Sequence, residues 1–259
     1  MDYEFLKFSV ASRVATVTLN RPKALNAINS GMLVELMGVF SQIKIDPDIH
    51  AAILTGAGKA FCAGADIKEM IGKSPVQVRD YTEQGQQIFA FIEELQKPVI
   101  AAVNGYAFGG GSELALACTF RYAATTAQFA QPEVKIGVIP GWGGTRRLTE
   151  AVGRGKALEM MLTGEPITAK EALRVGLVNV VTPKAQLMKK VRSVARKIGA
   201  NAPQAVKLAL NSANADNRGG LYANQQLEAS IIGLLAASKD RNEGIAAFIE
   251  KRKPKFTNE

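Results

Sequence analysis

The chain has 259 residues, of which 47% are hydrophobic and 21% charged, as in a soluble protein with a sizeable core. Its formal net charge is +9, which favours an anionic partner, either nucleic acid or a phosphate-bearing small molecule. Two cysteines, Cys62 and Cys118, and one histidine, His50, argue against a disulfide framework, a structural zinc site and a histidine-dependent catalytic triad.

Short apolar strands and amphipathic helices alternate in the first half of the chain, which predicts an α/β fold. We expect strands at residues 5–10 and 14–19 (a hairpin), 51–55 and 99–103, and helices at 30–45, 76–95 and 110–118. The run at 99–103 is too short to span a bilayer, and the first residues lack the pattern of a secretory signal. These features predict a soluble, cytoplasmic protein.

The second half is mostly helical in its pattern. We expect helices at residues 157–163, 168–175, 185–199, 205–213, 221–238 and 241–251, with one short strand at 177–181. The change near residue 200 predicts a core at 1–200 followed by a helical C-terminal subdomain at 201–259.

Two glutamates stand beside glycine-rich segments. Glu113 follows the glycines at 109–111, and Glu133 precedes a second glycine-rich segment at 137–144. Two carboxyl groups in one cleft can hold different protonation states and act together as acid and base. Glycine turns that open helices can direct backbone N–H groups at a developing oxyanion. The pattern therefore indicates proton chemistry beside a polarised carbonyl.

A third glycine-containing loop covers residues 56–68, and it fits neither common phosphate motif. A P-loop requires Ser or Thr after its lysine, whereas Ala60 follows Lys59. A dinucleotide fingerprint requires glycine at the position of Phe61.

Taken together, these motifs resemble the enoyl-CoA hydratase (crotonase) superfamily. The loops at 61–69, 98–113 and 128–147 carry the resemblance, which extends from residues 20–27 to 246–253 and is greatest to the short-chain hydratases. It implies a spiral of ββα repeats with a C-terminal helical trimerisation region, assembled as a homotrimer or as a hexamer made of two trimers. It also implies an acyl-CoA substrate, no metal and no cofactor beyond the coenzyme A that the substrate carries.

The resemblance assigns roles to individual residues. It implies that the N–H groups of Ala65 and Gly110 form an oxyanion hole for the thioester carbonyl. Glu113 would orient and activate water, Glu133 would exchange the proton on the carbon α to the thioester, and Gly141 would help to position the water. The expected coenzyme A contacts are Lys23, Lys59, Ala63, Ala65, Asp66, Ile67, Lys68 and Gly110, with Phe248 and Lys251 reaching the coenzyme A of a neighbouring subunit.

The sequence favours hydration of trans-2-enoyl-CoA, because double-bond isomerisation can dispense with a carboxylate at position 113. An isomerase remains the alternative reaction, and an RNA-binding role is a more distant alternative based on the charge alone. Trp142 departs from many relatives, which carry a smaller residue. It either shapes the acyl pocket or only packs.

Overall fold

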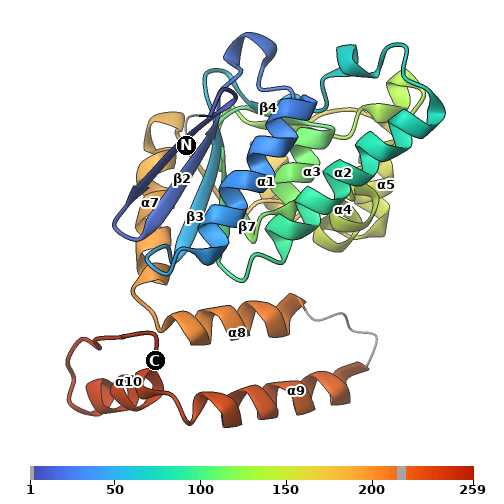
Figure 1. The fold of residues 1–259 in the computed structure, drawn as a ribbon. Coiled ribbons are helices and arrows are strands. Elements are labelled where there is room, and N and C mark those ends of the chain that lie inside the picture. The colour runs from blue at the N-terminus through green and yellow to red at the C-terminus, as the bar shows by residue number, and fades with distance from the viewer. Residues whose placement is uncertain (1–2, 215–219) are drawn as a thin grey trace.

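A computed structural model describes residues 3–214 and 220–259 (Figure 1). Its larger sheet has six strands in the order β1-β2-β3-β5-β7-β10, namely β1 (Leu6–Ala11), β2 (Val14–Leu19), β3 (Ala51–Gly56), β5 (Val99–Val103), β7 (Phe120–Ala124) and β10 (Val180–Thr182). Strands β1 and β2 form the expected antiparallel hairpin, and the remaining pairs are parallel. Ser12 and Arg13 turn the hairpin with positive φ angles, as in a type I′ turn.

A second sheet runs beside the first and contains four short strands. They are β4 (Ala60–Cys62), β6 (Tyr106–Phe108), β8 (Gln128–Ala130) and β9 (Ile167–Thr168), in that order across the sheet. Each of the pairs β3–β4, β5–β6 and β7–β8 adds one strand to each sheet, and a helix follows each pair. This arrangement confirms the expected spiral of ββα units.

Helices cover both faces of the six-stranded sheet. On one face lie α1 (Ser30–Ile45), α2 (Pro75–Glu93) and α3 (Gly110–Ala117), and on the other face lies α7 (Lys184–Gly199), as Figure 1 shows. The Asn29 side chain accepts the Met32 N–H to cap α1, and Ser74 and Gln77 form a capping box at the start of α2. Every residue of α3 is buried, so this helix begins inside the core.

Helices α4 (Gly144–Val152) and α5 (Arg154–Thr163) lie between β8 and β9 in the chain, and α6 (Ala169–Arg174) follows β9. The strand expected at residues 177–181 was placed too early, because β10 spans Val180–Thr182. Leu177 and Val178 are buried in the core, but Gly176 has φ +82° and the chain is still turning there. Leu177 and Val178 are apolar because they are buried in the core, and they do not belong to a strand.

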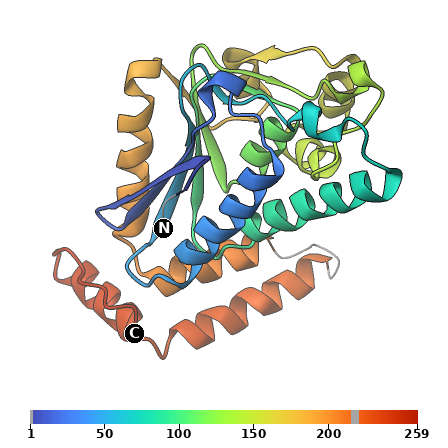
Figure 2. The same cartoon turned by 45° about the horizontal axis from the view of Figure 1, so that its top comes forward.

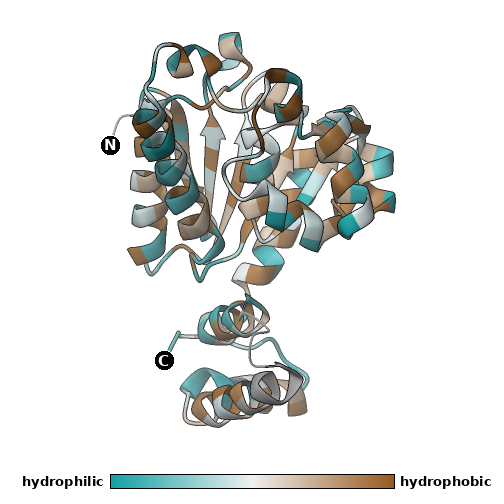
Figure 3. Ribbon diagram, turned by 90° about the vertical axis from the view of Figure 1, so that its right-hand side faces the viewer, coloured by the Kyte–Doolittle hydropathy of each residue, from teal (hydrophilic) through white to brown (hydrophobic). Residues whose placement is uncertain are grey.

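The last three helices form a layer outside the core: α8 (Pro203–Asn214), α9 (Gly220–Leu235) and α10 (Lys239–Ile249) (Figures 1 and 2). Figure 3 shows this layer from the side, with hydrophobic residues along its helices. Helix α8 has no buried residue, and Ile232, Leu234 and Phe248 are at least two-thirds exposed. Within one chain, this layer therefore leaves much apolar surface uncovered.

Candidate active site

A cavity of about 850 Å³ lies against α2, α3 and the loops that precede α3 and α4. Seven of the residues expected at the site line it: Ala63, Ala65, Ile67, Gly110, Glu113, Glu133 and Gly141. These residues come from four separate stretches of sequence, and the spiral of ββα units brings them together.

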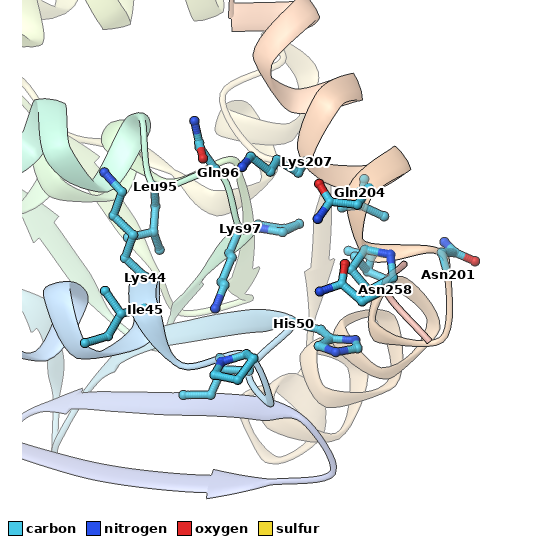
Figure 4. A pocket seen from close by; sticks show the side chains of 16 residues that line it. Lys44, Ile45, His50, Leu95, Gln96, Lys97, Asn201, Gln204, Lys207 and Asn258 are labelled. Atoms are coloured by element: carbon cyan, nitrogen blue, oxygen red, sulfur yellow. The ribbon is translucent and has the colours of Figure 1, made fainter. Parts of the chain in front are cut away.

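A smaller cavity of about 190 Å³ lies between the core and α8 (Figure 4). Lys44, Lys97 and Lys207 line it, but no carboxylate does. The Lys97 ammonium group donates to the main-chain carbonyls of Ile43 and Asp46 at the end of α1, and burial lowers its pKa. Lys97 holds the end of α1, and among the described residues this cavity lacks the pair of carboxyl groups that lines the 850 Å³ cavity.

Glu113 lies in the first turn of α3 and is only 2% exposed. Its Oε1 accepts the N–H of Trp142 at 2.8 Å and the N–H of Gly144 at 2.7 Å. Burial raises the pKa of Glu113, whereas these two hydrogen bonds and the charge of Arg147 lower it. Burial has the larger effect, so the pKa of Glu113 is raised overall, although both N–H donors stabilise the ionised carboxylate.

Gly144 has to lack a side chain for this arrangement to exist. A Cβ at position 144 would lie 2.8 Å from Glu113 Oε1 and 2.7 Å from the amide nitrogen of Gln131. This segment looks like a flexible loop because it is rich in glycine. The missing side chain of Gly144 lets the first N–H of α4 donate a hydrogen bond to the Glu113 carboxylate.

Glu133 opens a 3-10 turn (Glu133–Ile136) and faces the same cavity. Burial, and then repulsion from Glu113, raise the pKa of Glu133 to about 7, although a hydrogen bond from its own backbone opposes the shift. Its Oε1 lies 3.0 Å from the point that a Cβ on Gly109 would occupy, so it lies beside the start of α3. Its Oε2 is buried without a hydrogen-bond partner among the described residues.

The N–H groups of Ala65 and Gly110 lie close together at the same end of the cavity. A Cβ on Gly110 would lie 3.4 Å from the Ala65 nitrogen, and a Cβ on Gly64 would lie 3.6 Å from the Gly110 nitrogen. Hydrogen bonds to Ile28 on either side hold the first loop: Ile28 N–H donates to Gly64 O, and Asp66 N–H donates to Ile28 O, both at 2.8 Å. Within the described part of the chain, neither N–H of the pair donates to another group.

Six expected coenzyme A contacts do not line the cavity. Asp66 instead forms an ion pair with Arg21 at 3.0 Å and accepts the Lys68 N–H. Lys23, in a 3-10 turn (Pro22–Ala24), and Lys59, in the turn before β4, are both exposed. Phe248, in α10, is 83% exposed, and Lys251 follows that helix, so both belong to the outer helical layer.

Two residues at the site were not anticipated from the sequence. Arg147 donates to the Trp142 carbonyl at 2.8 Å and to the Glu93 carboxylate, which ties the segment before α4 to α2. Tyr81 lines the cavity from α2, and its hydroxyl donates to Ile28 O. Helical spacing does place Tyr81 on the inner face of α2, but no local signal shows what Arg147 contacts.

The site can therefore place two carboxyl groups of different environment and two free N–H donors around one small substrate. In the described ranges, no three His, Cys, Asp or Glu side chains lie close enough to hold a metal ion. Likewise, none of the helices described has the length and apolar character needed to cross a membrane.

A family model described as enoyl-CoA hydratase/isomerase matches residues 9–259. The chain is 42% identical to a crotonyl-CoA hydratase of Syntrophomonas wolfei, over 99% of each chain. It is 46% identical to a short-chain-enoyl-CoA hydratase of Clostridium acetobutylicum, over 93% of each. Among solved structures, an enoyl-CoA hydratase from Bacillus anthracis superposes with a TM-score of 0.96 at 40% identity, covering 99% of this chain and 100% of that one.

Proposed function

The chain belongs to the enoyl-CoA hydratase/isomerase family, and from this premise we propose that it hydrates short-chain trans-2-enoyl-CoA reversibly to 3-hydroxyacyl-CoA. The observation that carries the proposal is the pair Glu113 and Glu133, which share one cavity with the free N–H groups of Ala65 and Gly110. A hydratase needs both carboxyl groups, since one proton leaves water while another is added to carbon.

In the proposed reaction, the N–H groups of Ala65 and Gly110 bind the thioester oxygen. Water addition passes through enolate-like charge on that oxygen, and each fixed donor stabilises such a transition state by about 3–4 kcal/mol. Because both donors are already oriented by the loops that hold them, little reorganisation is needed as the charge develops.

The two carboxyl groups then divide the proton transfers. Glu113, whose carboxylate accepts two N–H groups, takes a proton from the water as the water oxygen bonds to the β carbon. Glu133, with a pKa of about 7, gives its proton to the α carbon. Afterwards Glu113 is protonated and Glu133 is ionised, so the pair still holds one proton. Gly141, on the cavity wall beside Trp142, would help to place the water.

We assign coenzyme A itself to the surface around the cavity mouth. Lys23, Lys59 and Lys68 would meet its phosphates, and Ala63, Asp66 and Ile67 would border it, with no further cofactor. A polyanionic substrate also gives a reason for the net charge of +9 that requires no nucleic acid.

We further propose that residues 201–259 form an oligomerisation subdomain beside a core at 1–200, assembled as a homotrimer or hexamer. The exposed apolar residues of α9 and α10 support this proposal. In the assembly, Phe248 and Lys251 would reach the coenzyme A of a neighbouring copy. Light scattering after size-exclusion chromatography should give three or six copies, and Leu234→Glu should lower that number. A wild-type monomer would overturn the proposal.

The direct test is the loss of conjugated enoyl-thioester absorbance when the protein is mixed with crotonyl-CoA. Glu113→Gln and Glu133→Gln should each slow this loss by about 10²–10⁴-fold, because each removes a positioned acid or base. Circular dichroism should show that both variants remain folded. Near-normal rates would remove the affected residue from the mechanism, and faster consumption of a 3-enoyl-CoA would identify an isomerase instead.

A further inference from the structure

Trp142, the only tryptophan of the chain, forms part of the cavity wall and is 4% exposed. Its indole ring lies between α2 and α3, where two glycines make room for it. A Cβ on Gly85 of α2 would come within 2.5 Å of the indole Cδ1, and a Cβ on Gly110 of α3 would come within 2.5 Å of Cε3. Neither position can therefore carry a side chain while the indole is in place.

Aromatic contacts fix the ring on its remaining sides. Tyr81 and Phe89, both on α2, lie with their ring centroids 5.6 Å and 5.3 Å from that of Trp142. The main chain of Trp142 is held as well, because its N–H donates to Glu113 and its carbonyl accepts from Arg147. With ring and backbone both anchored, the indole is a rigid wall and not a movable gate.

This wall is adjacent to the proposed oxyanion hole. The point where a Cβ on Gly110 would clash with the indole lies only 3.4 Å from the Ala65 nitrogen. An acyl group whose carbonyl bound between Ala65 and Gly110 would have the indole as a neighbour, because the ring fills the space between Gly85 of α2 and Gly110 of α3.

We propose that Trp142 limits the length of the acyl chain, and that Gly85 is the specificity-determining partner that lets the indole take this position. The inference rests on the proposed hydratase function and narrows its substrate class to acyl groups of about four carbons. Hydrophobic pockets discriminate a single methylene by roughly 10- to 200-fold, so a rigid aromatic wall is sufficient for a sharp cut-off.

The first experiment measures kcat/KM for trans-2-enoyl-CoA substrates of four, six, eight and ten carbons. For the wild type, we expect a fall of at least about tenfold from four to eight carbons. Trp142→Ala should raise the ratio of eight-carbon to four-carbon activity by at least about tenfold, and Trp142→Phe should raise it less. The phenylalanine variant keeps an aromatic ring against Phe89 and so provides the test if the alanine variant does not fold.

Gly85→Ala tests the other side of the contact. Alanine forms helices better than glycine does, so any loss of activity in this variant must come from displacement of the indole. This variant should lower activity with the four-carbon substrate, and in the Trp142→Ala background it should cause no further loss. Phe40→Leu, a large-to-small change at a fully buried residue of α1 outside the cavity, should leave the chain-length ratio unchanged.

A binding measurement separates this inference from the proposed function. Since Trp142 is the sole tryptophan, its fluorescence reports directly on the wall. Butyryl-CoA, which cannot be hydrated, should alter the emission more than coenzyme A alone does. If the wild type hydrates four- and eight-carbon substrates equally and Trp142→Ala leaves the ratio unchanged, the inference is wrong and the hydratase stands. If no enoyl-CoA is hydrated but butyryl-CoA perturbs Trp142 selectively, the hydratase proposal fails while the placement of the acyl group stands.

Discussion

The pair Glu113 and Glu133 should give hydration and dehydration the same dependence on pH. Hydration requires an ionised Glu113 and a protonated Glu133, and dehydration requires the reverse, so both active forms carry one shared proton. Water addition to an enoyl thioester takes up no net proton. The value of kcat/KM in either direction should therefore follow the fraction of enzyme in which the pair holds one proton.

The fall of kcat/KM at high pH, which is the upper limb of this profile, follows from the environment of Glu133. Burial and the neighbouring Glu113 raise its pKa to about 7, so the proton needed for catalysis is present below that pH and is lost as pH rises through it. For a group with this pKa, about 90% retains the proton at pH 6 and about 10% at pH 8. We expect kcat/KM to fall about tenfold over that interval in both directions.

The assay is the initial rate of enoyl absorbance change, with crotonyl-CoA and with 3-hydroxybutyryl-CoA, from pH 5.5 to pH 9 at constant ionic strength. Circular dichroism at each end of the range should show that the protein stays folded. Glu133→Gln should lose the limb near pH 7 together with most of the rate. A wild-type profile that stays flat to pH 9, or a limb that survives in Glu133→Gln, would refute the assignment of the shared proton to this pair.

Three substitutions test the structure that surrounds the site. Arg147→Met removes the cation that lowers the pKa of Glu113 and the bond that holds the segment before α4, so the acid limb should move to higher pH and kcat/KM should fall about tenfold. The exposed neighbour Arg146→Met should change neither. Asn26→Ala removes the side-chain amide that now binds two buried carbonyls and one partly buried carbonyl, and it should lower the free energy of unfolding by about 2–4 kcal/mol, measured with urea. Gly64→Ala places a side chain at φ +111°, which should cost about 1–3 kcal/mol of stability and shift the melting temperature down.

The elements that were predictable from sequence are those whose own residues determine their structure. Strands β3 and β5 are runs in which every residue is buried, and α1 carries its apolar face at helical spacing, so a local pattern was enough. The strands β4, β6 and β8 are three residues long and pair only within the short second sheet. Such segments are too short to show the alternation of apolar and polar residues that predicts a strand. They become strands because the spiral brings them side by side, where their main chains can pair.

The same distinction holds for the site. The motifs around Glu113 and Glu133 predicted which carboxyl groups to examine, and the cavity contains both. Helix α4 was missed because it begins at the second of two consecutive glycines, Gly143 and Gly144, which are typical of a loop. Its start is fixed by the bond from the Gly144 N–H to Glu113, 31 residues earlier in the chain. Interactions over that separation have no local sequence signal.

Gly110 connects the chemistry of this site to its specificity. Its N–H is one of the two proposed oxyanion donors, and its missing side chain is the space that the indole of Trp142 fills. Removing the indole should therefore open room for longer acyl chains and also loosen the support behind the donor. Because loss of a well-placed oxyanion donor costs about 10²–10³ in kcat, even partial loosening should lower the rate with the four-carbon substrate. A variant that gains activity on longer chains is thus expected to be slower on crotonyl-CoA, and the ratio of the two activities isolates the effect of the wall from the effect on the donor.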